Sequence, residues 1–358
     1  MTTRELSLID EPLTRSDVER LLSRAGSSDK LVLSGRNLSE IDLSDFNLTG
    51  TTLIGANLTK ANLTKAKLNG ANLYQANMIN ADLSEAEIIH ANLQRANLSE
   101  ANLRGANLSD AKLLGVNLNK ADLSQATLFQ ASLQEAMLND TDFSEANMSK
   151  SNLISAFLRG VNLSGADLSQ ASLYQSFLIQ TNLSGADLSG ASLKAAYLSQ
   201  ANLSYADLSE SIMFGVNLSE AILFKTNLNK ATLVDTYLSE DQLNNLGVKS
   251  LAELGVSGDT QKPSTEQDSS STIHLRIMEE PLTTQDLSTI MLALTEFYTK
   301  CWLIKQGRFA DLIEYTQTHD PRFSEEASLI ITKLTHDSPL RQGSNQSDRL
   351  NSQAAETM

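Results

Sequence analysis

The side chains that most often bind metals or act in catalysis are few in this sequence and widely spaced. No two histidines have the i, i+4 spacing with which one face of a helix holds a metal ion, and Cys301 is the only cysteine. One cysteine forms neither a disulfide framework nor a thiolate cluster. The histidines are His90, His274, His319 and His336. We therefore expect no metal site and no cofactor.

Serines are numerous, but their spacing does not resemble that of a catalytic nucleophile. They recur at multiples of five residues, with no basic residue at a fixed distance to act as a general base. Representative positions are Ser84, Ser124, Ser144, Ser164, Ser184 and Ser204. The sequence also lacks a G-x-x-x-x-G-K-S/T phosphate loop and a G-x-S-x-G nucleophile motif. We predict that the serines belong to turns and that the protein is not an enzyme.

A five-residue repeat covers most of the chain and must determine where the side chains there are placed. Residues 56–108 read A-N/D-L-x-x without interruption, and the same spacing holds over 43 units, from Leu33 to Leu243. The leucine position, called i below, holds Leu in 38 of these units. From Ala56 to Ala231, position i−2 always holds Ala, Ser, Thr or Val. Repeats are sought first, because a missed repeat misassigns the whole fold.

The period of five indicates the backbone geometry. It fits neither the 3.6-residue turn of an α-helix nor the two-residue alternation of a flat strand. It fits a coil in which each unit forms one side and one corner. Positions i and i−2 then point inward, where small residues at i−2 let the walls approach and leucine fills the centre. We expect positions i−1, i+1 and i+2 to face water.

The repeat resembles the pentapeptide-repeat family, whose unit is A-(D/N)-L-x-x. The resemblance implies an all-β main body, a right-handed quadrilateral parallel β-helix with four units and 20 residues per coil. Residues 31–245 would then form about 10–11 coils, roughly 50 Å long at a strand spacing of about 4.8 Å. Such chains are abundant in cyanobacteria, and the resemblance implies regulatory binding rather than catalysis.

The segments outside the repeat are predicted to cap and extend this body. Thr14 and Asp17 have the spacing of a helix capping box, and Ser239 favours a second helix that closes near Gly255. Solenoid ends need such caps because their last coils expose backbone and apolar side chains. The predicted order is an N-terminal segment with a capping helix (1–30), the β-helix (31–245), a C-terminal cap (246–255), a flexible linker (256–272), a small α+β module of β-α-α-β type (273–340) and a disordered tail (341–358).

One column of residues changes character halfway along the repeat. Residues 20 apart stack on one face if each coil has 20 residues. Asparagines from Asn37 to Asn117 give way to apolar residues in this column, and the column across the same corner also becomes aromatic. The predicted patch comprises Met137, Ile154, Phe157, Tyr174, Phe177, Tyr197, Phe214 and Tyr237.

Two interpretations of this patch are open. Large apolar patches usually mark contacts, whereas stacked aromatic residues also stabilise neighbouring strands. As a contact, the patch would hold the 273–340 module, a second copy of the chain in a homodimer, or an unidentified protein partner. We expect a non-enzymatic protein-interaction scaffold, with the 273–340 module serving oligomerisation or partner binding.

The charge balance argues against nucleic acid as a partner. The net charge is −15, whereas DNA binding needs a basic face. Asp167, Asp187 and Asp207 are predicted to stack in one column. Some proteins of the resembled family mimic duplex DNA, so the alternative function is a DNA-mimicking modulator of DNA gyrase. Interspersed lysines and the absence of interrupting loops count against it.

Localisation is predicted from what the sequence lacks. No run approaches the roughly 18 apolar residues of a membrane span, and the N-terminus has no signal-peptide pattern. We therefore expect a cytoplasmic protein with no membrane partner.

Overall fold

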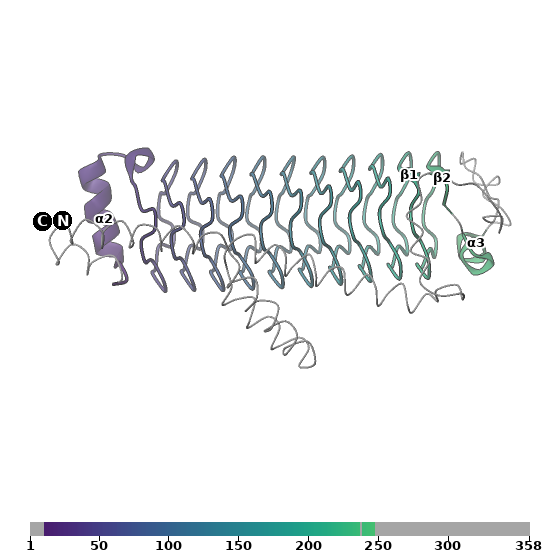
Figure 1. Ribbon diagram of the computed structural model, residues 1–358, viewed down its shortest axis with the longest axis horizontal. Helices are drawn as coiled ribbons and strands as arrows, with labels where there is room; N and C mark the ends of the chain where they lie inside the picture. Colours follow the sequence, from purple (N-terminus) through teal and green to yellow (C-terminus); the bar gives the residue numbers. More distant parts are fainter. Residues whose placement is uncertain (1–10, 237, 248–358) are drawn as a thin grey trace, which may run out of the picture. The chain divides into compact units, whose positions relative to one another are not determined.

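The computed structural model describes residues 11–236 and 238–247. The chain divides into two units, Met1–Thr272 and Ile273–Met358, and every described residue belongs to the first. The elements are helix α2 (Arg15–Ala25), 3-10 helix η1 (Ser28–Lys30), strands β1 (Ile212–Phe214) and β2 (Thr232–Val234), and helix α3 (Glu240–Leu246) (Figure 1). The predicted linker, module and tail lie outside the described residues, as does most of the predicted C-terminal cap.

Between α2 and α3 the chain winds into a parallel β-helix (Figure 1). Parallel bridges join each i−1 residue to the residue 20 further on, from Val32 with Thr52 to Asp207 with Asn227. Strands β1 and β2 pair in the same way, Ile212 with Thr232. Four such bridges per 20 residues make four sides, so the predicted coil of four units is confirmed here.

The interior consists of the i and i−2 side chains, as the pattern predicted. Leucines along the whole stack are fully buried, and small residues at i−2 are buried beside them. Where threonine replaces alanine at i−2, its hydroxyl finds a backbone partner. Thr141 Oγ1, for example, donates to the carbonyl of Leu118 at 2.7 Å. A buried hydroxyl without such a bond would cost about 1–3 kcal/mol.

The corners have two features that the water-facing assignment did not anticipate. Between Gly35 and Asp235, every i+2 residue has positive φ, comprising 11 glycines and 30 other residues with φ of 53–61°. In addition, an Asn or Asp at i−1, with the exception of Asn77, accepts a hydrogen bond from the backbone N–H of i+1, as Asn62 Oδ1 does from Thr64 at 3.1 Å. Where they occur, these side chains therefore close the turn as well as meeting solvent.

Helix α2 begins and ends with defined caps. Thr14 and Asp17 form the predicted capping box, and Gly26 ends the helix in the left-handed conformation. The hydrogen bond from the Thr14 hydroxyl holds the pKa of Asp17 below its ordinary value. Val18 is fully buried against the core of the stack, and Leu21 packs there in part.

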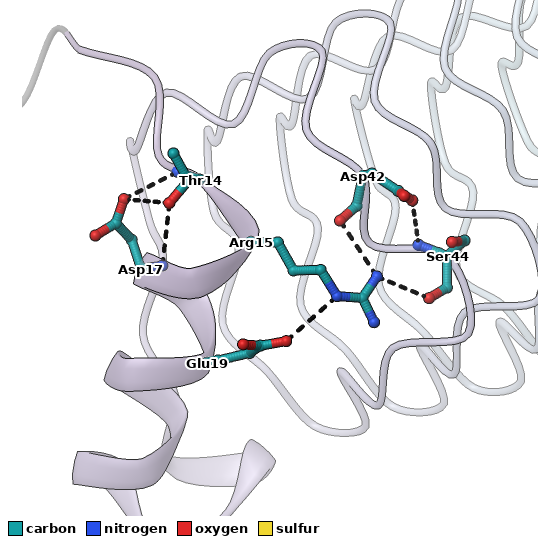
Figure 2. Close-up of polar contacts among 6 residues, drawn as sticks. All are labelled: Thr14, Arg15, Asp17, Glu19, Asp42 and Ser44. Atoms are coloured by element: carbon teal, nitrogen blue, oxygen red, sulfur yellow. Dashed lines mark hydrogen bonds and ion pairs between the residues drawn. The ribbon is translucent and has the colours of Figure 1, made fainter.

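The residues around the start of α2 also satisfy open backbone groups of the first coil (Figure 2). Leu13 N–H donates to the Asn37 carbonyl at 2.8 Å, where a preceding coil would donate. Arg15 Nη1 donates to the carbonyls of Asp42 and Ser44 at 3.4 and 3.2 Å. An unpaired strand edge invites association, so these contacts protect this end of the β-helix.

Helix α3 covers the C-terminal edge of the β-helix through a different kind of contact. In the stack, the backbone N–H of an i−1 residue donates to the carbonyl 21 residues earlier. Gln242 occupies such a position, but its side-chain Nε2 donates instead, to Ala221 at 3.0 Å and to Leu218 at 2.7 Å. A side-chain amide thus replaces one rung of the backbone ladder.

The end of the repeat differs from the prediction. Leu243 continues the five-residue spacing, yet it lies in α3, so the β-helix stops before residue 245. The helix starts after Ser239 as expected, but it ends at Leu246 with left-handed Gly247, rather than near Gly255. The cause is the capping box of Ser239 with Gln242, which starts a helix inside the last repeat unit. Neither described α-helix has the length and apolar character needed to cross a membrane.

Candidate protein-binding surface

An aromatic ladder runs along one side of the C-terminal half of the β-helix. It consists of Phe157, Phe177 and Tyr197, which are bridged to one another on consecutive coils. The rings of Phe157 and Phe177 are stacked 5.2 Å apart with an interplanar angle of 3°. Those of Phe177 and Tyr197 are 5.0 Å apart at 5°. The prediction that residues 20 apart stack is therefore confirmed for these three.

A second column flanks the aromatic ladder across one corner. Tyr174 and Phe214 are 40% and 49% exposed, and Ile154 is half-buried. Tyr197 in the ladder is 36% exposed, whereas Phe157 and Phe177 are half-buried between their neighbours. The structure thus brings six predicted patch residues to one corner.

Two predicted members do not extend this surface. Met137 is only 5% exposed, so its assignment to an exposed patch was wrong. It is bridged between Asn117 and Phe157, and the long unbranched methionine side chain fills gaps between neighbours. Tyr237 lies outside the described residues. Asn217 follows Tyr197 in the column, so the described ladder ends at three rings.

The coil sides that carry the ladder have no negative charge. Residues 151–160, 171–180 and 191–200 contain no carboxylate, although the chain has 43 acidic residues. Their only charged side chains are those of Arg159 and Lys194. The sides that carry the aromatic ladder therefore have a weakly basic character, on a chain whose net charge is −15.

The sequence analysis missed a second exposed cluster, on another corner of the last coils. Tyr205 is 60% exposed and meets the ring of Phe224 edge-on at 5.4 Å. Lys225 Nζ lies 5.5 and 5.4 Å from the centroids of these two rings. Ile222 adds an exposed apolar side chain on the same unit. A signal was available, because the column ending at Phe224 otherwise holds Ser, Thr or Arg from Ser44 onward.

The predicted acidic column exists, but its carboxylates take part in the turns. Asp167, Asp187 and Asp207 are bridged in succession. Each Oδ1 accepts a hydrogen bond from the serine N–H two residues later, at 2.8–2.9 Å. Asparagine plays the same part elsewhere in the stack, so turn formation accounts for aspartate at these positions.

The described part of the chain shows no grouping suited to metal chemistry. Within residues 11–236 and 238–247, no three His, Cys, Asp or Glu side chains gather closely enough to hold a metal ion. His90 Nδ1 lies 3.9 Å from an Asp110 oxygen, and the two side chains are 70% and 38% exposed.

Comparisons with known proteins agree with the repeat pattern. The pentapeptide repeats family matches in 8 copies, at residues 32–64, 56–94, 91–130, 126–165, 162–200 and 201–239. HetL, a pentapeptide repeat protein involved in heterocyst differentiation regulation in the cyanobacterium Nostoc sp. strain PCC 7120, is 34% identical, with a TM-score of 0.58. That similarity covers 61% of this chain and 96% of HetL.

Two further solved structures are more distant. A pentapeptide repeat protein from the thylakoid lumen of Arabidopsis thaliana is 30% identical over 32% of this chain and 76% of its own, with a TM-score of 0.26. QnrB1, a plasmid-mediated fluoroquinolone resistance protein, is 19% identical over 57% and 97%, with a TM-score of 0.36. No curated protein matches the chain. The family matches extend over more than half of the sequence and coincide with the coils, so this chain belongs to the pentapeptide-repeat family.

Proposed function

We propose that this protein is a non-enzymatic scaffold that binds another protein molecule through the aromatic ladder and its flanking column. The β-helix holds these side chains on a rigid backbone, because every rung is hydrogen-bonded to the next. A preformed surface loses little conformational entropy on binding. The proposal therefore assigns the coils a positioning role and the outward side chains the recognition role.

One observation separates this proposal from a purely structural reading. Stacking gives Phe157, Phe177 and Tyr197 a structural role, worth about 0.5–1.5 kcal/mol per ring pair. Among the described residues, however, Tyr174 and Phe214 belong to no ring pair, and they are 40% and 49% exposed. Stacking does not explain why large apolar rings occupy that column, whereas contact with a partner does.

The resemblance to HetL supports the same class of function. HetL is involved in regulating heterocyst differentiation, and it shares the repeat over nearly its whole length with this chain. A role for this protein in regulation by binding is consistent with that similarity. The alternative, a DNA-mimicking modulator of DNA gyrase, has weaker support, since the acidic column takes part in turns.

A comparison of two full-length variants tests the proposal. Tyr174→Ser with Phe214→Ser removes the column that stacking does not explain, and Tyr205→Ser with Phe224→Ser serves as the matched control on the other corner. We expect the first pair alone to remove specific proteins captured from an extract of cells that express this chain. Capture of the same proteins by both variants and by the wild type would overturn the proposed surface.

A further inference from the structure

We infer that the aromatic ladder binds a second copy of this chain, side by side and related by a two-fold axis near Phe177. The inference rests on the proposed function and names the partner of that same surface. In such a pair, Phe157 of one copy lies opposite Tyr197 of the partner subunit, and the two Phe177 side chains meet at the axis. A two-fold contact uses one patch on both copies, as most homodimers do.

The spacing of the rings favours a partner with the same repeat. Successive ladder centroids are 5.2 and 5.0 Å apart, close to the distance between adjacent β-strands. A partner surface contacts all three rungs equally only if its own side chains recur at that distance. The corresponding ladder of a second copy meets this condition without any rearrangement of the backbone.

The distribution of charge favours the same partner. Two copies with a net charge of −15 each repel one another over most of their surfaces. The sides that carry the aromatic ladder have no carboxylate in residues 151–160, 171–180 and 191–200. Contact across these three rungs brings no carboxylates together, and Arg159 and Lys194 reduce the repulsion between two acidic molecules. The fourth rung, which holds Phe214, carries one carboxylate, that of Glu220. The acidic column of Asp167, Asp187 and Asp207 lies on a different side of the coil from the aromatic ladder.

The size of the contact surface sets the expected strength of the dimer. Four rungs, from Ile154 to Phe214, span about 20 Å at the usual strand spacing, and two sides of the coil give a similar width. The contact would bury about 400 Å² per copy, or about 800 Å² in total, below the roughly 1,200 Å² of stable interfaces. We therefore expect a weak dimer whose population rises with concentration, rather than an obligate one.

The test combines sedimentation of the full chain with a pyrene label at one position. In a Cys301→Ser background, Gln175→Cys places the label beside the proposed axis. Gln75→Cys places it at the same position of the repeat five coils away, where the backbone conformation matches, with φ of 56° against 55°. Phe177→Lys, made with or without a labelled cysteine, puts two like charges at the axis of the pair. Phe224→Lys is the control for a charge elsewhere.

The inference predicts a rise in mass from 38.9 kDa toward twice that value with increasing concentration, for the wild type and for Phe224→Lys. Phe177→Lys should stay monomeric while its circular dichroism spectrum remains unchanged. Excimer emission should appear for Gln175→Cys and not for Gln75→Cys, and Phe177→Lys should abolish it. A monomer at every concentration, or a dimer that Phe177→Lys leaves intact, would overturn the inference. The proposed function would still stand if Tyr174→Ser with Phe214→Ser removed captured proteins.

Discussion

The N-terminal and C-terminal halves of the β-helix share one interior but differ on one outer column. In the N-terminal half this column holds asparagines, such as Asn57, whose Nδ2 donates to Asn37 Oδ1 at 3.2 Å. In the C-terminal half the same column holds the stacked rings of Phe157, Phe177 and Tyr197. The inward residues barely change between the halves. The comparison shows that the inward side chains specify the coil. The residues of the outer columns can therefore vary and acquire a binding role.

The largest expected effect tests whether the two interiors are equivalent. Leu63→Ala and Leu183→Ala remove fully buried leucines from the same side of the coil, six coils apart. Each should lower the free energy of unfolding by about 2–5 kcal/mol, since truncation leaves a cavity. Urea denaturation of both variants measures the costs. If only one half were sensitive, the interiors would not be equivalent.

A smaller effect is expected at the C-terminal edge. Gln242→Ala leaves two buried carbonyls, those of Leu218 and Ala221, without their side-chain donor. We expect a loss of about 1–3 kcal/mol, because an unmade buried hydrogen bond costs its desolvation. Hydrogen exchange should become faster in the last coils and stay unchanged near α2. Faster exchange throughout would show that the edge does not open locally.

Glycine substitutions in the turns should stabilise the fold slightly, and to a similar extent in both halves. Ala195 and Glu100 are i+2 residues with φ of 54° and 60°, a conformation that costs L-residues about 1–2 kcal/mol. Replacing either with glycine should raise the unfolding midpoint slightly, with part of the gain offset by glycine's greater freedom in the unfolded chain. The neighbouring Ala196→Gly, at a buried i−2 position, is the control and should destabilise the fold. A loss of stability in both turn variants would refute this account of the corners.

The smallest effect concerns how low pH changes the stability of the helices at the two ends of the β-helix. Hydrogen bonding from Thr14 lowers the pKa of Asp17, and that from the Ser44 backbone lowers the pKa of Asp42. A carboxyl whose pKa is depressed by folding adds stability above its unfolded pKa and loses that contribution as pH falls through its folded pKa. Below about pH 4, α2 should therefore exchange its amides faster.

The opposite end supplies the comparison for this acid effect. Helix α3 is anchored through the Gln242 amide, which does not titrate. Exchange rates corrected for intrinsic pH dependence should therefore rise in Arg15–Ala25 more than in Glu240–Leu246. Asp17→Asn should reduce the difference between the two helices. Equal acceleration at both ends would contradict the assignment.

Most of the fold could be predicted from the sequence because its period is regular. Leucine at i and small residues at i−2 specify the interior, and the spacing of 20 specifies which residues meet. The left-handed i+2 residues escaped prediction because Lys, Glu and Gln together occupy 20 of these positions, whereas glycine occupies 11. The end of the repeat was missed for a related reason, since Leu243 keeps the spacing while Ser239 and Gln242 start a helix.

The candidate surface was only partly predictable. Columns of side chains follow from the period, so the stacking of Phe157, Phe177 and Tyr197 could be expected. Exposure could not, because it depends on how a flexible side chain such as that of Met137 settles between its neighbours. The cluster at Tyr205 was missed because its two rings, those of Tyr205 and Phe224, come from different columns of successive coils.

The most direct test of the central claim returns the aromatic column to the asparagine of the other half. Phe177→Asn with Tyr197→Asn restores the residue that the N-terminal half uses at this position. If the rings serve contact, the variant should unfold within about 1 kcal/mol of the wild type, since asparagine regains a turn hydrogen bond in place of stacking. Its self-association and its capture of partners should both be lost. A variant that loses several kcal/mol of stability yet keeps its associations would show that the rings hold the coils together and that recognition lies elsewhere.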